Sequence, residues 1–432
     1  MRTTGTYHID NYGTFKKKLL EFLKTYRYFS FLESNNYAED KYASFQCLIA
    51  FGEVSSFTLK ADDPLEACEA LNMGKEWLFG FLSYELKNKT ENLDTKKPSQ
   101  LSFPNMFFFR PSYVIRVEGE KAYLETDESV SEQEALQVWG KIMASESVNP
   151  ETTKAELKAR VNKEQYVHTV GQLKEHISKG NVYEVTYCME FYVEEKNFDP
   201  YSLYLQLIDL SPTPFAGIFK YDDQFILSAS PERFLRKTGN RLISQPIKGT
   251  IKRGSFPEED LRYRNELKSS GKERSENVMI VDLVRNDLSK IAVPGTVKVD
   301  ELFGIYGFQQ VNQMISTVSC EIQESTSFKE ILQALFPMGS MTGAPKHKAL
   351  QLIDEYETIG RGIYSGSIGY LDPQGNFDLN VLIRSIFYDD QKKYLSFSVG
   401  SAITQYCEPE AEYEECLLKA RGIMQALGAR LC

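Results

Sequence analysis

The segment Gln245-Pro-Ile-Lys-Gly-Thr250 places a primary amine, Lys248, in a loop that is suited to face a ligand. Pro246 fixes its own φ angle and biases Gln245 towards extended geometry, and Gly249 allows the backbone to approach a bound molecule closely. An unprotonated lysine at such a place is a nucleophile for covalent catalysis. The competing interpretation is a solvated surface lysine, which is the commoner case.

Two predicted helices each carry a pair of glutamates three residues apart, Glu273 with Glu276 and Glu412 with Glu415. Residues at this spacing share a helix face, and Lys419 continues the second stripe. If the stripes converge, four carboxylates would surround a hard cation such as Mg²⁺. In an acidic protein such pairs are also typical of solvated helix faces, so the spacing leaves both interpretations open.

A glycine-rich segment, Phe336-Pro-Met-Gly-Ser-Met-Thr-Gly-Ala-Pro-Lys346, leads into a predicted helix with Pro345 in its first turn. Free backbone N–H groups at this start, with Thr342 beside them, could bind an anion. The glycine spacing differs from a Walker P-loop, and no Ser or Thr follows the lysine. A structural helix cap is the alternative.

Two further charged residues belong to apolar strands: one follows the end of a strand, and the other lies within a strand. Glu232, in Ser228-Ala-Ser-Pro-Glu-Arg-Phe234, follows a strand at a turn and could act as an acid if it is buried near a ligand. Arg384 lies in a strand between Ile383 and Ile386 and needs a carboxylate partner, either from a ligand or from an internal acidic residue.

The composition limits the function. The chain has 432 residues, 42% of them hydrophobic, and 50 Lys+Arg against 60 Asp+Glu give a net charge of −10. This length allows two or three domains or one large two-lobed enzyme, and the negative charge argues against a nucleic-acid or anionic-membrane partner. Any anionic substrate must then be held by local positive charge. No apolar signal region or membrane-length apolar run is present, so we expect a cytoplasmic protein.

The seven cysteines are scattered without a Cys-x-x-Cys pair, and the four histidines have no Cys or His neighbours. Disulfides, a zinc site and a serine or thiol triad therefore have little support. Carboxylates and lysines must carry any chemistry.

Residues 1–150 contain short aromatic strand-like runs, and the polar stretch from Ser145 to Lys158 is the best linker, so we divide the chain into 1–150 and 151–432. Asn162 and Gln165 form a capping box for a helix that ends at Gly180. In the strand that follows, residues 183–193, every second residue is apolar, which predicts that Glu184, Thr186 and Glu190 point away from the buried face. The irregular alternation of helices and strands favours an α+β fold.

These segments, in this order, resemble the chorismate-utilising enzymes, which include anthranilate synthase component I, aminodeoxychorismate synthase component I, isochorismate synthase and salicylate synthase. The resemblance covers about residue 160 to the end and is looser before 145, where Phe31-Leu-Glu-Ser34 is similar to a segment that forms a tryptophan pocket, here with Glu33 and Ser34, in some members. It implies a two-lobed fold with large antiparallel β-sheets packed face to face and helices outside. It rests on six segments: Ser228–Phe234, Pro246–Thr250, Ser275–Asp287, Gly339–Lys346, Gly366–Tyr370 and Glu410–Glu415.

The resemblance also implies roles for the residues that match the family motifs. Lys248 in Pro-Ile-Lys-Gly-Thr favours aminodeoxychorismate synthase, because anthranilate synthases carry alanine there. Isochorismate and salicylate synthases have a lysine base at the position of Glu184. Because this chain has a glutamate there, the resemblance disfavours water as the nucleophile. Lys248 would then be the nucleophile and Glu232 the general acid. The remaining implied roles are Mg²⁺ binding, direct or through water, by Glu276, Glu415, Glu273 and Glu412, and substrate binding by Arg384, Tyr364, Lys419, Thr342, Gly343 and Gly400.

The implied reaction is amination of chorismate by ammonia at C4, giving 4-amino-4-deoxychorismate on the way to 4-aminobenzoate and folate. No Gly-x-Cys-x-Gly segment is present, so ammonia from glutamine would require a separate amidotransferase subunit. Gln313 stands where the family usually has a histidine, and Met338 and the run Val399–Ile403 also depart from the pattern. The alternatives are anthranilate synthase component I and a non-catalytic chorismate-binding subunit.

Overall fold

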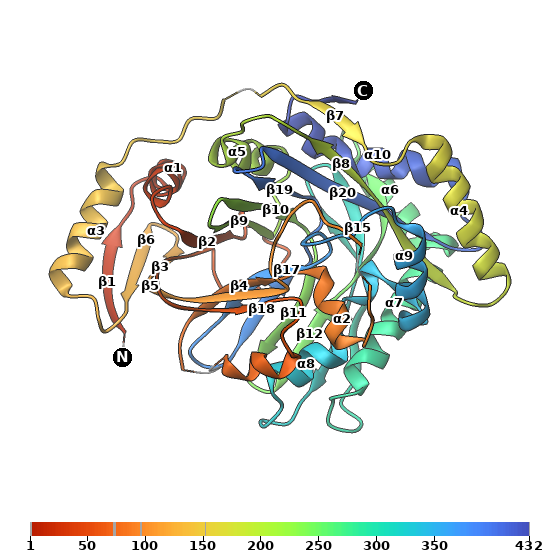
Figure 1. Cartoon of the computed structure of the whole chain (residues 1–432), viewed down its shortest axis with the longest axis horizontal. Coiled ribbons are helices and arrows are strands. Elements are labelled where there is room, and N and C mark those ends of the chain that lie inside the picture. The colour runs from red at the N-terminus through yellow and green to blue at the C-terminus, as the bar shows by residue number, and fades with distance from the viewer. Residues whose placement is uncertain (1, 72–74, 96, 152, 432) are drawn as a thin grey trace.

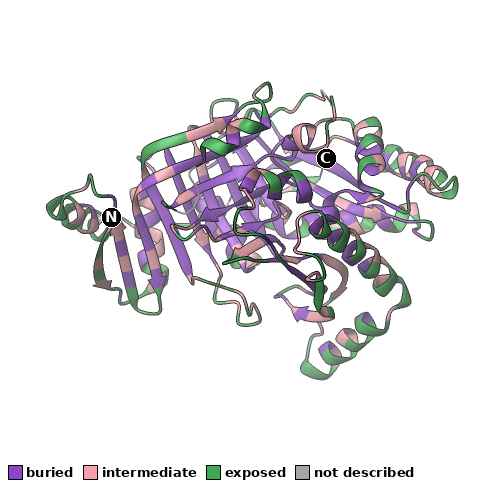
Figure 2. Ribbon diagram, turned by 90° about the horizontal axis from the view of Figure 1, so that it is seen from below, coloured by how far each residue is buried: buried purple, intermediate pink, exposed green. Residues whose placement is uncertain are grey.

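The computed structural model describes residues 2–71, 75–95, 97–151 and 153–431. An extensive network of antiparallel β-strands occupies the centre of the molecule, and the helices lie around it (Figure 1). The central strands are largely buried, whereas the helices expose one face to solvent (Figure 2). This is the α+β architecture, with antiparallel sheets and outer helices, that the sequence predicted.

Strands from both predicted regions of the chain pair within this network. β2 (Tyr28–Glu33) pairs with β9 (Phe215–Tyr221), and β4 (Leu78–Leu82) pairs with β17 (Ser367–Leu371). The described residues between 145 and 155 belong to no helix or strand, and they follow α3 (Glu132–Ala144) and precede β7 (Glu156–Ala159). The linker that divides the sequence therefore does not divide the sheet.

The helices of the described chain begin and end as follows: α1 Tyr12–Leu23, α2 Lys87–Thr90, α3 Glu132–Ala144, α4 Lys163–Ser178, α5 Pro200–Leu210, α6 Pro257–Ser269, α7 Gly271–Ser289, α8 Phe328–Leu335, α9 Lys346–Tyr356 and α10 Pro409–Ala426. The strands that surround the site are β8 Glu184–Val193, β10 Gln224–Ser230, β11 Arg233–Thr238, β13 Ile247–Lys252, β15 Val311–Glu321, β16 Gly343–Ala344, β18 Phe377–Asn380, β19 Ser385–Asp389 and β20 Tyr394–Ile403. The other strands are β1 Thr3–His8, β3 Cys47–Leu59, β5 Met106–Glu118, β6 Lys121–Thr126, β12 Arg241–Gln245, β14 Lys298–Gly307 and β21 Arg430–Leu431. Within the described part of the chain, no helix is both long and apolar enough to cross a bilayer.

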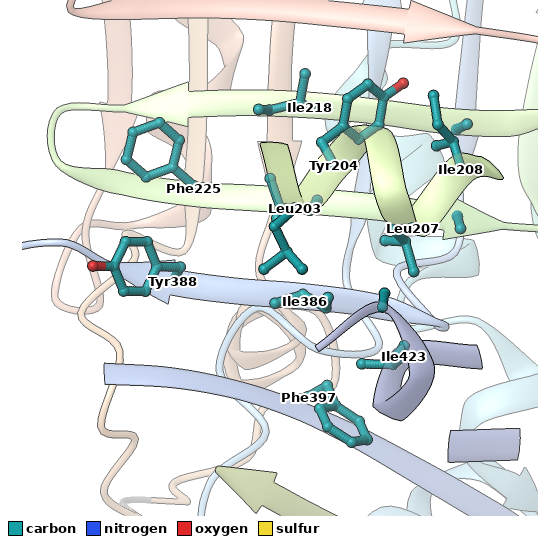
Figure 3. Close-up of a cluster of buried hydrophobic side chains, with 14 of the residues drawn as sticks. Leu203, Tyr204, Leu207, Ile208, Ile218, Phe225, Ile386, Tyr388, Phe397 and Ile423 are labelled. Atoms are coloured by element: carbon teal, nitrogen blue, oxygen red, sulfur yellow. The ribbon is translucent and has the colours of Figure 1, made fainter. Parts of the chain in front are cut away.

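The hydrophobic core holds α5 and α10 against the sheet. Leu203 and Leu207 of α5 lie with Ile386 of β19, Phe397 of β20 and Ile423 of α10 in one apolar cluster (Figure 3). Each of these side chains is buried, and full burial of a Leu, Ile or Phe contributes about 1.5–3 kcal/mol. This packing fixes α10, whose acidic stripe was predicted to bind metal, against β20.

Local sequence signals set the helix starts, and the signal at Asn162 was predicted. Asn162 and Gln165 form a complete capping box at the start of α4, and Ser270 caps α7 through the Glu273 N–H. Pro409 occupies the first turn of α10. Both helices that carry a Glu-x-x-Glu pair therefore form where the sequence placed them.

Candidate active site

A cavity of about 810 Å³ lies between the sheet and helices α7 and α10. Its walls come from segments that are far apart in the sequence, from Thr186 of β8 to Gln425 near the end of α10. Ten of the residues predicted for catalysis, substrate or metal line it: Glu232, Lys248, Glu273, Glu276, Tyr364, Arg384, Gly400, Glu412, Glu415 and Lys419.

Lys248 projects from β13 and is held on two sides. Its Nζ donates to Glu184 Oε1 at 2.6 Å, and its backbone carbonyl accepts from the Asn277 amide at 3.3 Å. Burial alone lowers the pKa of Lys248, but the Glu184 carboxylate outweighs it, and the net pKa is raised. The lysine is therefore an ammonium in this state and must lose a proton to act as a nucleophile.

Gly249, beside Lys248, has a φ of 101°, which favours glycine. A Cβ atom there would lie 3.0 Å from Glu273 Oε2 of α7. Because residue 249 is a glycine, the Glu273 carboxylate of α7 can lie close to its backbone. It brings one of the predicted metal ligands against the Lys248 loop.

Glu232 occupies the turn between β10 and β11, as predicted, and is 4% exposed. Burial raises the pKa of Glu232 to about 7, although Ser340 and Lys248 oppose the shift. A carboxyl group with such a pKa retains a substantial protonated fraction at neutral pH. Glu232 can therefore donate a proton to a leaving group in the cavity.

Arg384 is not part of a strand, contrary to the sequence prediction. It lies in the break between β18 and β19 with a φ of 51°, and this left-handed residue interrupts the predicted continuous strand. Within the described residues it forms no ion pair. Burial lowers the pKa of Arg384 to about 10, so the guanidinium remains charged at neutral pH and can bind an anionic ligand.

The glutamate pairs of α7 and α10 line the same cavity. Burial and neighbouring carboxylates raise the pKa of Glu276 to about 7 and also raise the pKa values of Glu273 and Glu412. The Lys419 ammonium instead lowers the pKa of Glu415. The cavity wall formed by these helices thus carries poorly compensated negative charge.

Lys272 of α7 lies between the two acidic stripes. Its Nζ is 3.9 Å from Glu276 Oε1 and 3.7 Å from Glu412 Oε1. In this arrangement, no group of three or more acidic, Cys or His residues in the described chain is placed to hold a metal ion. The four carboxylates still fit a hard cation by their chemistry, because they supply oxygen ligands and excess negative charge.

Lys419 supplies the second ammonium of the site, and its side chain is 29% exposed. Its Nζ donates to the Gly400 carbonyl at 2.9 Å and lies 2.8 Å from Glu415 Oε1, which leaves a third N–H for a ligand. Gly400 faces Cys188 across the sheet, where a Cβ atom would lie 2.5 Å from its Sγ. The close packing of β20 on β8 therefore positions Lys419. The buried phenol of Tyr364 lines the same cavity.

Thr342 and Gly343 do not line the cavity. Thr342 is fully buried, and its hydroxyl donates to the Gly339 carbonyl at 3.1 Å. Gly343 pairs with β8, and a Cβ atom there would lie 2.2 Å from the Glu184 carbonyl oxygen. In this structure the glycine-rich turn supports the strand that carries Glu184.

Glu33 and Ser34 border a separate cavity of about 70 Å³. The Glu33 carboxylate is buried and accepts hydrogen bonds from Tyr12 at 2.9 Å, Lys16 at 2.9 Å and Tyr204 at 2.6 Å. Its charge is therefore already neutralised within the protein. Tryptophan binding at these residues stays a prediction.

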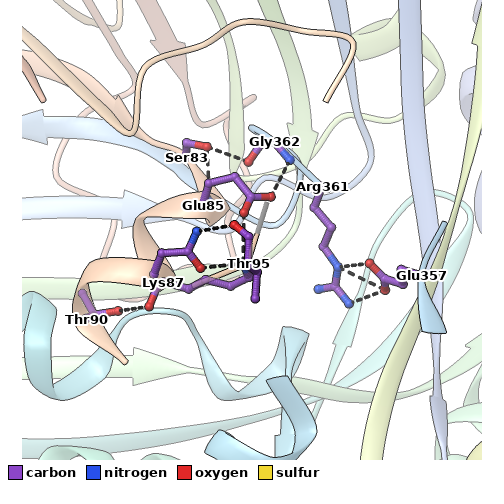
Figure 4. A network of polar contacts seen from close by, with 9 residues as sticks. Ser83, Glu85, Lys87, Thr90, Thr95, Glu357, Arg361 and Gly362 are labelled. Carbon is purple, nitrogen blue, oxygen red and sulfur yellow. Dashed lines mark hydrogen bonds and ion pairs between the residues drawn. The ribbon is translucent and has the colours of Figure 1, made fainter. Parts of the chain in front are cut away.

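A network of buried polar groups supports the wall opposite the acidic helices (Figure 4). Arg361 pairs with Glu357 and donates to the backbone carbonyls of Met341 at 2.7 Å and Thr186 at 3.0 Å. The Tyr84 ring, from the N-terminal region, packs 4.6 Å from the guanidinium. Because Met341 and Thr186 both line the cavity, the first 150 residues help to hold its shape.

Comparison with known proteins gives one family model, the chorismate binding enzyme, which matches residues 29–425. The chain belongs to the chorismate binding enzyme family. It is 30% identical to aminodeoxychorismate synthase component 1 of Escherichia coli K12, over 91% of this chain and 92% of that protein.

Two further relatives extend the comparison. The chain is 40% identical to the chloroplastic aminodeoxychorismate synthase of Arabidopsis thaliana over 62% of its residues, but this match spans only 29% of that longer protein. The structure of anthranilate synthase component I from Streptococcus pneumoniae is similar with a TM-score of 0.77 at 23% identity, covering 87% of this chain and 91% of that one. At this identity the structural similarity establishes the fold.

Two features of this chorismate binding enzyme escaped the sequence analysis. β8 is buried on both faces, so Glu184 and Glu190 point into ion pairs and not into solvent; strict alternation could not reveal a second covered face. Lys272 adjoins Glu273 in sequence and could have been found from its i,i+4 spacing to Glu276. Gln313, which the sequence analysis named as a departure from the family pattern, lines the cavity, and its buried amide oxygen has no hydrogen-bond partner within the described residues.

Proposed function

We propose that this chain aminates chorismate with ammonia at C4 and produces 4-amino-4-deoxychorismate. The observation that carries this proposal is the amine of Lys248, which lines one cavity together with the raised-pKa acid Glu232 and the unpaired guanidinium of Arg384. The relatives named aminodeoxychorismate synthase support it.

Once the Lys248 ammonium has released one proton to solvent, the chain's own groups account for the remaining protons and bonds. The neutral Lys248 amine adds at C2, both ring double bonds shift, and the C4 hydroxyl leaves as water with the proton of Glu232. Ammonia then adds at C4, and the lysine leaves C2 as a neutral amine. The ammonium formed at C4 returns a proton to Glu232, which restores the acid.

Chorismate is a dianion, and its recognition requires positive charge inside an acidic protein. Arg384 and the remaining N–H of Lys419 would bind one carboxylate, with Tyr364 beside them. For the ring carboxylate we propose Mg²⁺ held by Glu276 and Glu415 directly and by Glu273 and Glu412 through water. When bound, the cation would neutralise that carboxylate and withdraw electron density from the ring.

The second candidate is anthranilate synthase component I, which the fold of the Streptococcus pneumoniae relative makes reasonable. Lys248 disfavours it, because the amine fills the position from which water or ammonia would otherwise attack C2. A non-catalytic chorismate-binding subunit is the third possibility. For the proposed enzyme, a separate glutamine amidotransferase subunit would supply ammonia, as the name component 1 of the E. coli relative suggests.

Mass spectrometry of the products decides among these functions. The purified chain is incubated with chorismate, Mg²⁺ and an ammonium salt, and products are separated by liquid chromatography. We expect one amine nitrogen to replace one hydroxyl oxygen with the enolpyruvyl group retained. Anthranilate with pyruvate would identify the second candidate, and unchanged chorismate would identify the third.

A further inference from the structure

Glu184 contacts the Nζ atom of Lys248 from behind the cavity wall. The two side chains are 4% and 10% exposed, and their charged atoms lie 2.6 Å apart. Lys248 lines the cavity, whereas Glu184 is not one of its lining residues. Glu184 is therefore placed to act on the lysine and not on a ligand in the cavity.

The glycine-rich turn fixes Glu184 in this place. Tyr183 N–H donates to the Ala344 carbonyl at 2.7 Å, and Thr186 N–H donates to the Thr342 carbonyl at 2.7 Å, one bond on each side of Glu184. Gly343 must be glycine for the two backbones to approach this closely.

We propose that Glu184 is the proton partner of Lys248: it holds Nζ at the cavity wall and keeps the amine protonated until the proton is released for reaction. This inference rests on the proposed function, because it assigns Glu184 to the nucleophile of that reaction. It makes Glu184 a positioning residue, and it explains why a carboxylate stands on β8 next to the reactive amine.

Several other charged groups face the Lys248 ammonium. Carboxylates on α7, α10 and the turn after β10 favour the protonated amine, and the second ammonium opposes it. Within the described residues, only Glu184 has a charged atom in ion-pair contact with Nζ. The more distant groups are Glu232, Glu273, Glu276, Glu415 and Lys419.

The test measures the protonation of Lys248 without chorismate. The full-length protein is reductively methylated with formaldehyde and cyanoborohydride at pH 6 to 9, and modification of Lys248 is quantified by peptide mass spectrometry, with the exposed Lys179 as an internal reference. Glu184→Gln keeps the length and a hydrogen bond but removes the charge. We expect its Lys248 profile to move to lower pH by about one unit, so that Lys248 is modified about tenfold faster at pH 7.

Glu190→Gln is the matched control, because Glu190 lies on the same strand and is ion-paired with Arg160 at 2.9 Å, away from Lys248. Its Lys248 profile should superimpose on that of the parent. Glu184→Ala should shift the profile as Glu184→Gln does and also lower kcat about tenfold relative to Glu184→Gln, with the chorismate KM within about threefold. A Glu184→Gln profile identical to the parent's overturns the inference, whether or not the parent aminates chorismate. If the profile shifts but the parent consumes no chorismate, the proton pairing stands and the proposed function fails.

Discussion

Lys248 has two requirements that conflict within a single side chain. Its ion pair with Glu184 stabilises the buried ammonium, yet addition to chorismate requires the neutral amine. Removing either member of a buried ion pair leaves the other uncompensated, which typically costs about 3–5 kcal/mol. Substitutions of Lys248 therefore affect both chemistry and stability, and the two effects must be separated.

Lys248→Arg is the variant that separates them. A guanidinium keeps the charge opposite Glu184 but stays protonated, so we expect near-normal thermal stability with aminodeoxychorismate formation reduced about 10³-fold or more. Lys248→Ala should lose the same activity and also unfold at lower temperature. The measurements are product formation with ammonium and thermal unfolding by circular dichroism. Turnover by Lys248→Arg at the parental rate would remove the lysine from the mechanism.

The pH dependence of turnover should show the pKa of Glu232, which is about 7 in the absence of ligands. The reaction needs a protonated Glu232 and a neutral Lys248, whose pKa is the higher of the two. Below pH 7, each decrease of one pH unit lowers the fraction of neutral Lys248 tenfold. Above pH 7, the gain in neutral Lys248 is offset by the loss of protonated Glu232. Turnover should rise with pH to about 7 and then level off.

This profile is measured as kcat/KM for chorismate with saturating Mg²⁺ and a constant concentration of unprotonated ammonia. Glu232→Gln cannot donate the proton and should lower turnover by about 10²–10⁴-fold across the range. A variant with unchanged turnover would show that the leaving hydroxyl takes its proton from another group.

The side chain at position 313 affects which product the enzyme releases. Aromatisation of the aminated ring requires a base, and the Gln313 amide cannot accept a proton. Glu184 lies behind the cavity wall and is engaged by Lys248. We therefore expect pyruvate release to stay at background in a coupled lactate dehydrogenase assay with ammonium, Mg²⁺ and chorismate. Pyruvate formed in step with chorismate loss would instead support anthranilate synthase.

At the scale of elements, the two acidic helices line the same cavity. Glu276 and Glu415 project from different helices, so a bound Mg²⁺ would tie α7 to α10. Each Glu→Gln substitution removes one negative charge from a hard-cation site. We expect both variants to bind Mg²⁺ at least about tenfold more weakly by titration calorimetry and to lose turnover.

Lys272 supplies the matched control for this experiment. Its ammonium lies within 4 Å of Glu276 and Glu412 and competes with a metal cation for the same carboxylates. Lys272→Gln should therefore bind Mg²⁺ more tightly than the parent protein, the opposite direction to the glutamate variants. If Glu276→Gln, Glu415→Gln and Lys272→Gln all bound Mg²⁺ with the affinity of the parent protein, these carboxylates would not be metal ligands.

The sequence predicted elements well where the signal was local. The Asn162–Gln165 capping box and the Glu-x-x-Glu spacing depend on neighbours within one turn, and both appear as predicted. The errors concern long-range contacts. Arg384 leaves its strand in a left-handed conformation, and Glu184 turns inward to a lysine 64 residues away. The residue pattern within a strand does not show which distant residue will pack against it.

The whole molecule links its N-terminal region to the site through the sheet. β2 pairs with β9 and β4 with β17, and Tyr84 packs on Arg361, which supports the cavity wall. The division at residue 150 therefore separates the sequence but not the architecture, because strands from both parts share one hydrogen-bonded network.

The complete chain should use ammonia but not glutamine. Glutamine hydrolysis requires a reactive nucleophile, commonly a thiolate, whereas the six cysteines in the described chain are buried, and burial raises the pKa of Cys188 to about 12. Cys432 lies outside the described residues, and Cys432→Ser removes its thiol from the test. We expect ammonium to support amination, and glutamine freed of ammonium to support neither amination nor glutamate release, in the parent and in Cys432→Ser. Glutamate release by the parent protein would mean that the chain carries its own glutaminase. If Cys432→Ser then released no glutamate, the Cys432 thiol would be identified as the nucleophile.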